Sequence, residues 1–317
     1  MTVETDQLVL AAHRRLTGAD GKLPDPAEAS GLYQQAALKG SGRAANRLAV
    51  IAAMGVGRPA NWREALDWLV EAARLGDLLA QQQIALLAQH VPSDPKTANW
   101  AGLRGSIDID GLLEPPAVRR VSASPTIVLI DQLVPPVICR WFIAQAQGRL
   151  QQAVVGDPLT KRWLPDANRT GLSAGFGLLD TEVVMVLAQE RLVRATGMVL
   201  HQLEAPQVLS YEAGQQYKQH ADYFNPEYPA FAEMLSIFGQ RVATCLTWLN
   251  DDFAGGETDF PRARFRHKGR TGDAMVFMNV TRDQKPDPMS VHAGLPVSQG
   301  RKWLLSQWVR DREQPII

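Results

Sequence analysis

A 36-residue repeat in the first hundred residues is the feature that most restricts the fold of this chain. Residues 28–40 and residues 64–76 each open on Glu-Ala, contain a pair of alanines and end at a glycine. A fixed period of this length, with small residues where helices cross, predicts helix-turn-helix units that stack on one another. We therefore expect an α-helical repeat region over residues 1–100. The echoed pairs include Ala36 with Ala72, Gly40 with Gly76, Ala44 with Ala80, and Leu48 with Ile84.

These units resemble Sel1-like repeats, which are related to the tetratricopeptide class. Two units are few for an independent solenoid, so we expect them to pack on residues 9–16 and against a following domain. Two functions stay open. The repeats either bind a partner or present a substrate, or they form a helical cap that only stabilises the rest of the protein.

Proline-rich breaks follow the repeats at residues 92–95 and 114–116, and residues 101–124 show little periodicity. This pattern predicts a linker over 101–124 and a second domain over 125–317. A strand over 126–130, a helix over 137–152 and a second long helix over 182–203 are predicted for its first part, with the helices buttressing a barrel. The last helix has the spacing of one packed and one solvated face.

The sequence contains an H-x-D pair, His220 and Asp222, and a further histidine, His292, in residues 290–294 (SVHAG). Two imidazoles and one carboxylate can occupy one face of an octahedral metal, as in the non-haem Fe(II) oxygenases. Residues i and i+2 of a strand project to the same side, so both members of the pair could reach one ion. The surrounding residues 208–223 predict two short strands joined by a tight turn at 212–214. Alone, an H-x-D pair seldom binds metal.

An alternating run, residues 302–309 (KWLLSQWV), predicts a strand near the C-terminal end of the sequence. Lys302, Leu304, Ser306 and Trp308 share one of its faces, an arrangement that suits the wall of a pocket. A lysine inside a barrel requires an anion, because a buried ammonium is costly unless it is paired. The distal carboxylate of 2-oxoglutarate would serve. The alternative is a solvated lysine at the start of a strand.

Several blocks of sequence occur together and in a fixed order over residues 205–310. With them, the chain resembles the prolyl 4-hydroxylase branch of the 2-oxoglutarate- and Fe(II)-dependent dioxygenases, and a weaker match extends the resemblance to about residues 125–312. The blocks are 207–224 (QVLSYEAGQQYKQHADYF), 239–244 (GQRVAT), 255–261 (GGETDFP), 272–277 (GDAMVF), 292–297 (HAGLPV) and 300–303 (GRKW).

The resemblance implies roles for individual positions. It makes His220, Asp222 and His292 the iron ligands and Lys302 the partner of the distal carboxylate of 2-oxoglutarate. Tyr211 and Thr258 match positions that help to hold this co-substrate, and Trp308 matches an aromatic lining position. Thr258 could instead be a simple sheet hydroxyl, and Trp308 an ordinary tryptophan of the barrel core.

The resemblance also implies an α+β fold, in which the helical repeats precede a double-stranded β-helix (jelly-roll) with buttressing helices. The implied cofactor is Fe(II), with 2-oxoglutarate and O2 as co-substrates and ascorbate as a reductant. The implied reaction couples decarboxylation of 2-oxoglutarate, to succinate and CO2, to hydroxylation of a substrate C–H bond. Related halogenases lack the carboxylate ligand, so a chain with Asp222 should hydroxylate.

Substrate contacts are also implied by resemblance. Residues 156–177 predict a glycine-bearing loop, and its Arg169-Thr170 resembles the mobile substrate-covering loop of the prolyl hydroxylases. Gly171 stands where the family pattern has a serine. Tyr217 and Arg241 match further substrate-side positions. The alternative for Arg241 is a salt-bridged arginine beside the barrel.

Composition excludes several classes of function. The formal net charge is zero, and no basic run predicts nucleic-acid binding. The two cysteines, Cys139 and Cys245, have neither a disulfide pattern nor zinc-type spacing. No leader-like start and no apolar run of about 18 residues is present, so we expect no membrane partner and a reducing cytoplasm.

These features predict an enzyme that hydroxylates C4 of a proline in a peptide or protein, which the helical repeats could help to bind. One alternative keeps the chemistry and changes the substrate to a free amino acid or another small metabolite. A second alternative is a sensor or scaffold that does not turn over and uses the repeats to recruit a partner.

Overall fold

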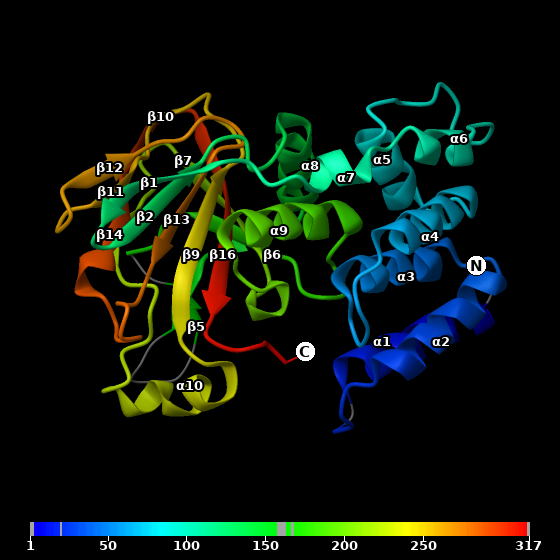
Figure 1. Ribbon diagram of the computed structural model, residues 1–317, viewed down its shortest axis with the longest axis horizontal. Coiled ribbons are helices and arrows are strands. Elements are labelled where there is room, and N and C mark those ends of the chain that lie inside the picture. Colours follow the sequence, from blue (N-terminus) through cyan, green and yellow to red (C-terminus); the bar gives the residue numbers. More distant parts are fainter. Residues whose placement is uncertain (1–2, 20, 157–162, 166–167, 316–317) are drawn as a thin grey trace. The chain divides into compact units, whose positions relative to one another are not determined.

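The chain divides into two compact units, and the first of them is discontinuous in sequence. The computed structural model describes residues 3–19, 21–156, 163–165 and 168–315 (Figure 1). Unit 1 takes in Met1–Glu114, Gly177–Glu190 and Pro315–Ile317, and unit 2 takes in Pro115–Phe176 and Arg191–Gln314. A segment from the middle of the sequence therefore belongs with the N-terminal helices.

Helical hairpins make up the N-terminal part of unit 1. They comprise α1 (Val3–Thr17), α2 (Pro26–Leu38), α3 (Gly42–Met54), α4 (Trp62–Arg74) and α5 (Leu78–Leu87). Both α2 and α4, and likewise α3 and α5, begin 36 residues apart, as the repeat predicts. Their N-caps repeat too: Asp25 and Asn61 cap the first helix of each pair, and Ser41 and Asp77 cap the second. The assignment to the Sel1-like class stays a prediction.

A buried ion pair joins the repeats to the distant segment within unit 1. Arg47 of α3 pairs with Glu182, which directly precedes α9 (Val183–Thr196), and each residue is 5% exposed. Nη1 of Arg47 also donates to two backbone carbonyls, at 2.9 and 2.8 Å. The second carboxylate oxygen of Glu182 accepts from Asn46 (2.9 Å) and Gln83 (2.6 Å). This network satisfies a buried charge from both sides, which is the condition for keeping one in an interior.

The predicted linker over residues 101–124 contains regular structure, and the boundary between the two units, after Glu114, falls within it. It holds α6 (Trp100–Gly105), α7 (Ile109–Leu113) and β1 (Val118–Ala123). The helices are capped by Asn99 and Asp108, but each is too short to produce a periodic apolar pattern. The strand is an edge strand that pairs with β2 (Thr126–Ile130), the strand predicted at these residues.

Unit 2 is built on antiparallel sheets. The larger has the order β1-β2-β13-β9-β16-β7-β6-β3, and a smaller one has the order β12-β11-β14-β8. The remaining strands of the larger sheet are β3 (Gln151–Gln152), β6 (Leu172–Gly175), β7 (Gln207–Glu212), β9 (Arg241–Trp248), β13 (Ala274–Met278) and β16 (Arg301–Arg310). Those of the smaller are β8 (Tyr217–His220), β11 (Thr258–Phe260), β12 (Phe265–His267) and β14 (His292–Gly294). Two-stranded pairs are formed by β10 (Ala254–Gly255) with β15 (Val297–Gln299), and by β4 (Val154–Gly156) with β5 (Trp163–Pro165).

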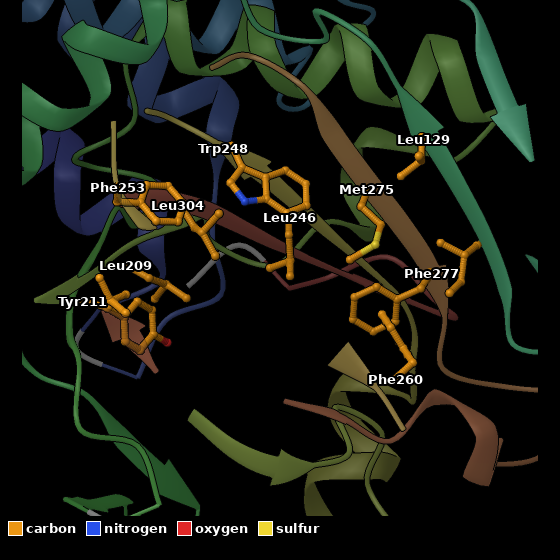
Figure 2. Packing of buried hydrophobic residues seen from close by; sticks show 12 residues of the cluster. Leu129, Leu209, Tyr211, Leu246, Trp248, Phe253, Phe260, Met275, Phe277 and Leu304 are labelled. Carbon is orange, nitrogen blue, oxygen red and sulfur yellow. The ribbon is translucent and has the colours of Figure 1, made fainter. Parts of the chain in front are cut away.

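The main hydrophobic core of unit 2 draws side chains from both sheets (Figure 2). Leu246, Trp248 and Leu304 come from the centre of the larger sheet, where β9 and β16 run side by side (Figure 1). Phe260, from β11 of the smaller sheet, packs edge-on against Phe277, with their ring centroids 5.0 Å apart. The two sheets therefore face each other across a shared core, as in the predicted double-stranded β-helix.

The ends of α8 and α9 differ from the predicted boundaries. The helix predicted over 137–152 is α8 (Pro136–Gln147), because Gly148 ends it and residues 151–152 pair with β6. The helix predicted over 182–203 ends as α9 at Thr196, where Gly197 takes a positive φ of 74°. A 3-10 turn (Leu200–Gln202) follows, and α10 (Ala232–Phe238) precedes β9.

The segment predicted as a loop over 156–177 contains strands where it is described. These are β5 and β6, with β6 paired to β7 in the larger sheet. Residues 157–162 and 166–167 lie outside the described residues, and the role of a substrate-covering lid stays a prediction. Within the described part of the chain, no helix combines the length and apolar character needed to cross a bilayer.

Candidate active site

The smaller sheet brings the predicted metal ligands together. His220 ends β8 and His292 begins β14, and the antiparallel register places these two residues opposite each other. Asp222 completes the group, with one ligand atom from each residue lying within 4.8 Å of the others. The carboxylate oxygens lie 3.6 Å from Nε2 of His220 and 3.8 Å from Nε2 of His292.

Asp222 does not lie on the same strand as His220, in contrast to the prediction. Strand β8 ends at His220, because its partner in the register, His292, is the first residue of β14 and no paired residue remains beyond it. Asp222 therefore sits in the bend that follows. The bend, rather than an extended strand, directs the Asp222 carboxylate toward both imidazoles.

Each histidine is oriented by a backbone carbonyl. Nδ1 of His220 lies 2.8 Å from the carbonyl oxygen of Lys218, and Nδ1 of His292 lies 3.0 Å from that of Ser290. A carbonyl oxygen only accepts, so the proton resides on Nδ1 and Nε2 keeps its lone pair for a metal. Burial, with His292 nearby, lowers the pKa of His220 to about 3, so its neutral form is favoured.

Asp222 is held by a hydrogen-bonded chain that the sequence did not reveal. The Thr244 hydroxyl donates to Oδ2 of Asp222 (2.7 Å), and the Asn279 amide donates to the Thr244 hydroxyl (2.9 Å). Both partners are at most 1% exposed. Burial opposes the charged carboxylate, but His292, His220, Arg241 and this hydroxyl together lower the pKa of Asp222 to about 2. A threonine and an asparagine within a strand-rich sequence give no periodic signal that would single them out.

Lys302 is buried beside this group, at the start of β16. It is 2% exposed, and its Nζ donates to the carbonyl oxygen of Gly256 at 2.6 Å. Burial lowers the pKa of Lys302 to about 7, although Glu257 opposes the shift. Among the described residues this ammonium has no ion-pair partner within 4 Å and only a carbonyl acceptor, so the site suits an anionic ligand.

A single pocket is lined by most of the residues predicted for the site. The face of β16 that carries Lys302, Leu304, Ser306 and Trp308 forms one wall, as the alternation predicts. The other predicted residues in the lining are Arg169, Tyr211, Tyr217, Thr258, His220, Asp222 and His292. The Tyr217 ring stacks on the His220 ring, with their centroids 3.4 Å apart.

Arg241 is the exception among the predicted substrate contacts. It does not line this pocket, and it makes a two-pronged ion pair with Glu204, at 2.6 and 2.8 Å. Its guanidinium lies over the Trp308 ring, 3.8 Å from the centroid. Arg310 binds the same carboxylate. The structure therefore matches the alternative of a salt-bridged arginine, which supports Trp308 from behind the pocket.

Gly171, the departure from the family pattern, is explained by the Tyr211 ring. A Cβ at this position would lie 2.5 Å from Cε1 of Tyr211 and 2.9 Å from the carbonyl oxygen of Ser210. Any side chain here would displace the Tyr211 ring, which is 6% exposed and lines the pocket. Glycine at position 171 is thus required by the position of Tyr211.

The facial group of two imidazoles and one carboxylate, inside a double-stranded β-helix and beside a buried lysine, defines the class of non-haem Fe(II) oxygenases. The family model and the curated relatives agree with this class. Residues 206–310 match the 2OG-Fe(II) oxygenase superfamily.

Among curated relatives, prolyl 4-hydroxylase 1 of Arabidopsis thaliana is 34% identical over 208 residues, which cover 61% of this chain and 71% of that protein. Probable prolyl 4-hydroxylase 10 of the same plant is 31% identical over 197 residues, covering 56% and 66%. Among solved structures, the viral collagen prolyl hydroxylase vCPH of Paramecium Bursaria Chlorella virus-1, in its 2OG complex, is 24% identical with a TM-score of 0.44, covering 58% and 94%.

The chain belongs to the prolyl 4-hydroxylase family of 2-oxoglutarate- and Fe(II)-dependent dioxygenases. It is an enzyme that uses Fe(II) as cofactor and 2-oxoglutarate as co-substrate. The residues of this site fit both groups, because two imidazole nitrogens and a carboxylate face one point and a buried lysine lines the same pocket.

Proposed function

We propose that this enzyme hydroxylates C4 of a proline in a peptide or protein. The observation that carries the proposal is the convergence of the ligand group and Lys302 in one pocket, within a chain of the prolyl 4-hydroxylase family. One O2 is consumed with one 2-oxoglutarate, which gives succinate, CO2 and one hydroxylated C–H bond. One oxygen atom enters succinate and the other enters the product.

In this proposal His220, Asp222 and His292 bind Fe(II) through Nε2, a carboxylate oxygen and Nε2. The bound metal supplies the oxidising chemistry, and the protein supplies ligation and orientation. The carbonyls behind both imidazoles hold each Nε2 toward the ion, and Thr244 holds the carboxylate. This support keeps the three donors in place before the metal arrives.

Lys302 is proposed to bind the distal carboxylate of 2-oxoglutarate. The ammonium lies 5.7 Å from the centroid of the Tyr211 ring, and Thr258 lines the same pocket. We propose that Tyr211 and Thr258 complete the co-substrate site, while Trp308 closes its apolar wall. An anion here would restore the charge that burial removes from Lys302.

The proposal is tested with the purified protein, Fe(II), 2-oxoglutarate and proline-containing peptides. We expect 4-hydroxyproline by mass spectrometry, with succinate formed in equal amount. The His292→Ala variant should lose both products, since an incomplete ligand group cannot hold the metal. Succinate without hydroxyproline from any proline-containing compound would exclude prolyl hydroxylation while leaving the dioxygenase chemistry intact.

The second candidate is hydroxylation of a free amino acid or another small metabolite. The pocket contains a buried arginine, Arg169, with unused donors, which favours a small charged group close to the reaction centre. A metabolite extract incubated with the enzyme, and compared with the His292→Ala variant, should then show a mass gain of one oxygen.

A further inference from the structure

Arg169 is fixed beside the metal ligands by its backbone. The carbonyl oxygen of Asn168 accepts from the amide of Lys218 at 2.8 Å, and the amide of Thr170 donates to the carbonyl of Gln216 at 3.1 Å. The Thr170 hydroxyl also accepts from the amide of Gln216, at 2.9 Å. Residues 168–170 therefore run along the start of β8, and Arg169 enters the pocket from a docked segment.

The Arg169 side chain is buried with one edge unused. It is 5% exposed, and its Nη1 donates to the carbonyl of Val154 at 3.0 Å. Its Nε and Nη2 make no well-aligned hydrogen bond to any described residue, and the guanidinium interacts with the neighbouring Tyr211 hydroxyl. These two nitrogens carry parallel N–H groups, and this edge of a guanidinium matches the two oxygens of a carboxylate. A buried charged edge of this kind is costly unless a ligand meets it.

The unused edge lies close to the reaction centre. The guanidinium carbon of Arg169 is 5.1 Å from the centroid of the Tyr217 ring, which in turn stacks on His220. Arg169 lines the same pocket as Asp222 and Lys302. A group bound to this edge would therefore lie in the same pocket as the three ligand residues.

Charge in the pocket leaves Arg169 uncompensated. The charges of Fe(II) and Lys302 balance those of Asp222 and a doubly charged 2-oxoglutarate, so the guanidinium remains in excess. Behind Trp308, Glu204 carries one negative charge for the two arginines that bind it. Among the described residues that line the pocket, the count with Fe(II) and 2-oxoglutarate bound therefore leaves one positive charge, at Arg169.

We propose that Arg169 binds a carboxylate of the substrate, so that the enzyme selects prolines with a carboxylate close to the ring. The carboxylate would come from an acidic neighbouring side chain, from the C-terminus of a peptide that ends in proline, or from free proline itself. This inference rests on the proposed function and adds the chemical class of the substrate to it.

The test compares three matched pairs of compounds that differ by one charge. They are a peptide with Glu or Gln beside an internal proline, a peptide that ends in proline as the acid or the amide, and proline or prolinamide. Dissociation constants are measured on protein saturated with Zn(II) and 2-oxoglutarate, which does not turn over, and kcat/KM is measured separately with Fe(II).

We expect the acid of at least one pair to bind about tenfold to a hundredfold more tightly than its amide, the range of a charge-assisted hydrogen bond. The Arg169→Gln variant should reduce this ratio to about one, and Arg169→Lys should leave a part of it, because it keeps the charge and loses the parallel donors. Arg140→Gln, at an exposed position of α8, is the matched control and should keep the wild-type ratio. The pair that shows the preference identifies the source of the carboxylate.

Two results would overturn the inference. One is equal binding of acid and amide in every pair, even if prolines are hydroxylated. The other is a larger loss of affinity for 2-oxoglutarate than for the acids in Arg169→Gln, which would assign Arg169 to the co-substrate. A preference in binding without oxygenation of any of these compounds would support Arg169 as a carboxylate site and refute prolyl hydroxylation.

Discussion

The two units of this protein bury charge in opposite ways. In unit 1, the Arg47–Glu182 pair is satisfied from within, since carbonyls and amide side chains meet the donors and acceptors that the pair leaves over. In the pocket of unit 2, Lys302 has one carbonyl partner and Arg169 keeps a free edge. A buried charge whose hydrogen bonds and ion pairs are all made by protein atoms stabilises the fold. A buried charge that lacks such partners indicates a position where a ligand binds.

Removing one member of the Arg47–Glu182 pair should produce the largest effect, a loss of free energy of unfolding. The Glu182→Leu variant leaves Arg47 buried without its counter-charge, and we expect a loss of about 3–5 kcal/mol in the free energy of unfolding. Urea unfolding followed by circular dichroism measures this loss. The double variant Arg47→Met/Glu182→Leu should recover most of it, because removing both charges also removes the cost of burying them. A loss below about 1 kcal/mol in the single variant would mean that the pair is solvated in solution.

Removing the ammonium of Lys302 should weaken 2-oxoglutarate binding and stabilise the ligand-free protein. In Lys302→Met, the 2-oxoglutarate concentration for half-maximal succinate formation should rise about tenfold to 150-fold, the equivalent of a charge-assisted pair. Affinity for Fe(II) should change far less. The ligand-free variant should be more stable than wild type, by on the order of 1 kcal/mol, because a buried unpaired ammonium has been removed. Thermal unfolding measures this, with the exposed Lys285→Met as control. A destabilised variant would contradict the reading of Lys302 as an open charge.

Asp222 has one carboxylate oxygen that accepts a hydrogen bond from Thr244 and another that faces the metal position. The Thr244→Val variant should weaken Fe(II) binding about tenfold or more, as loss of a hydrogen bond to a metal ligand does. Competition with a fluorescent chelator measures the affinity. Thr247→Val is the control, because Thr247 is equally buried on β9 and alternates to the opposite face of the strand. Equal losses in both variants would point to a general packing defect.

The last expected effect is on the pH dependence of 2-oxoglutarate binding. Burial lowers the pKa of Lys302 to about 7, so its charge is present below that pH and is lost as the pH rises through it. Binding of the anion needs the ammonium, so the dissociation constant should rise up to about tenfold per pH unit above pH 7, with uptake of one proton. Calorimetry between pH 6.5 and 9 measures both quantities. A constant affinity over this range would show that Lys302 stays charged without its ligand.

The sequence predicted the elements with strong periodic signals and missed those that depend on contacts across the chain. The 36-residue period predicted the starts of the paired helices, and alternation predicted the pocket face of β16. Asp222 was placed on a strand because the spacing allows it, whereas the end of β8 is decided by pairing with β14. Arg47 and Glu182 are separated by 135 residues, and no local pattern relates them.

Site residues divide in the same way. His220, Asp222 and His292 were recognisable because the family pattern fixes their residue types and order. Thr244 and Asn279 were not, since their importance lies in two hydrogen bonds that form only when β9 and the end of β13 meet the bend after β8.

The discontinuity of unit 1 has a consequence for the order in which the protein can fold as it is synthesised. Arg47 leaves the ribosome 135 residues before Glu182, a delay on the order of ten seconds at about 5–20 residues per second. During this interval the emerging helices hold a charge that they have no means to neutralise. We therefore expect the repeats to reach their final packing only after residue 182 has been synthesised, and an N-terminal fragment that stops before Glu182 to be less stable than the complete unit.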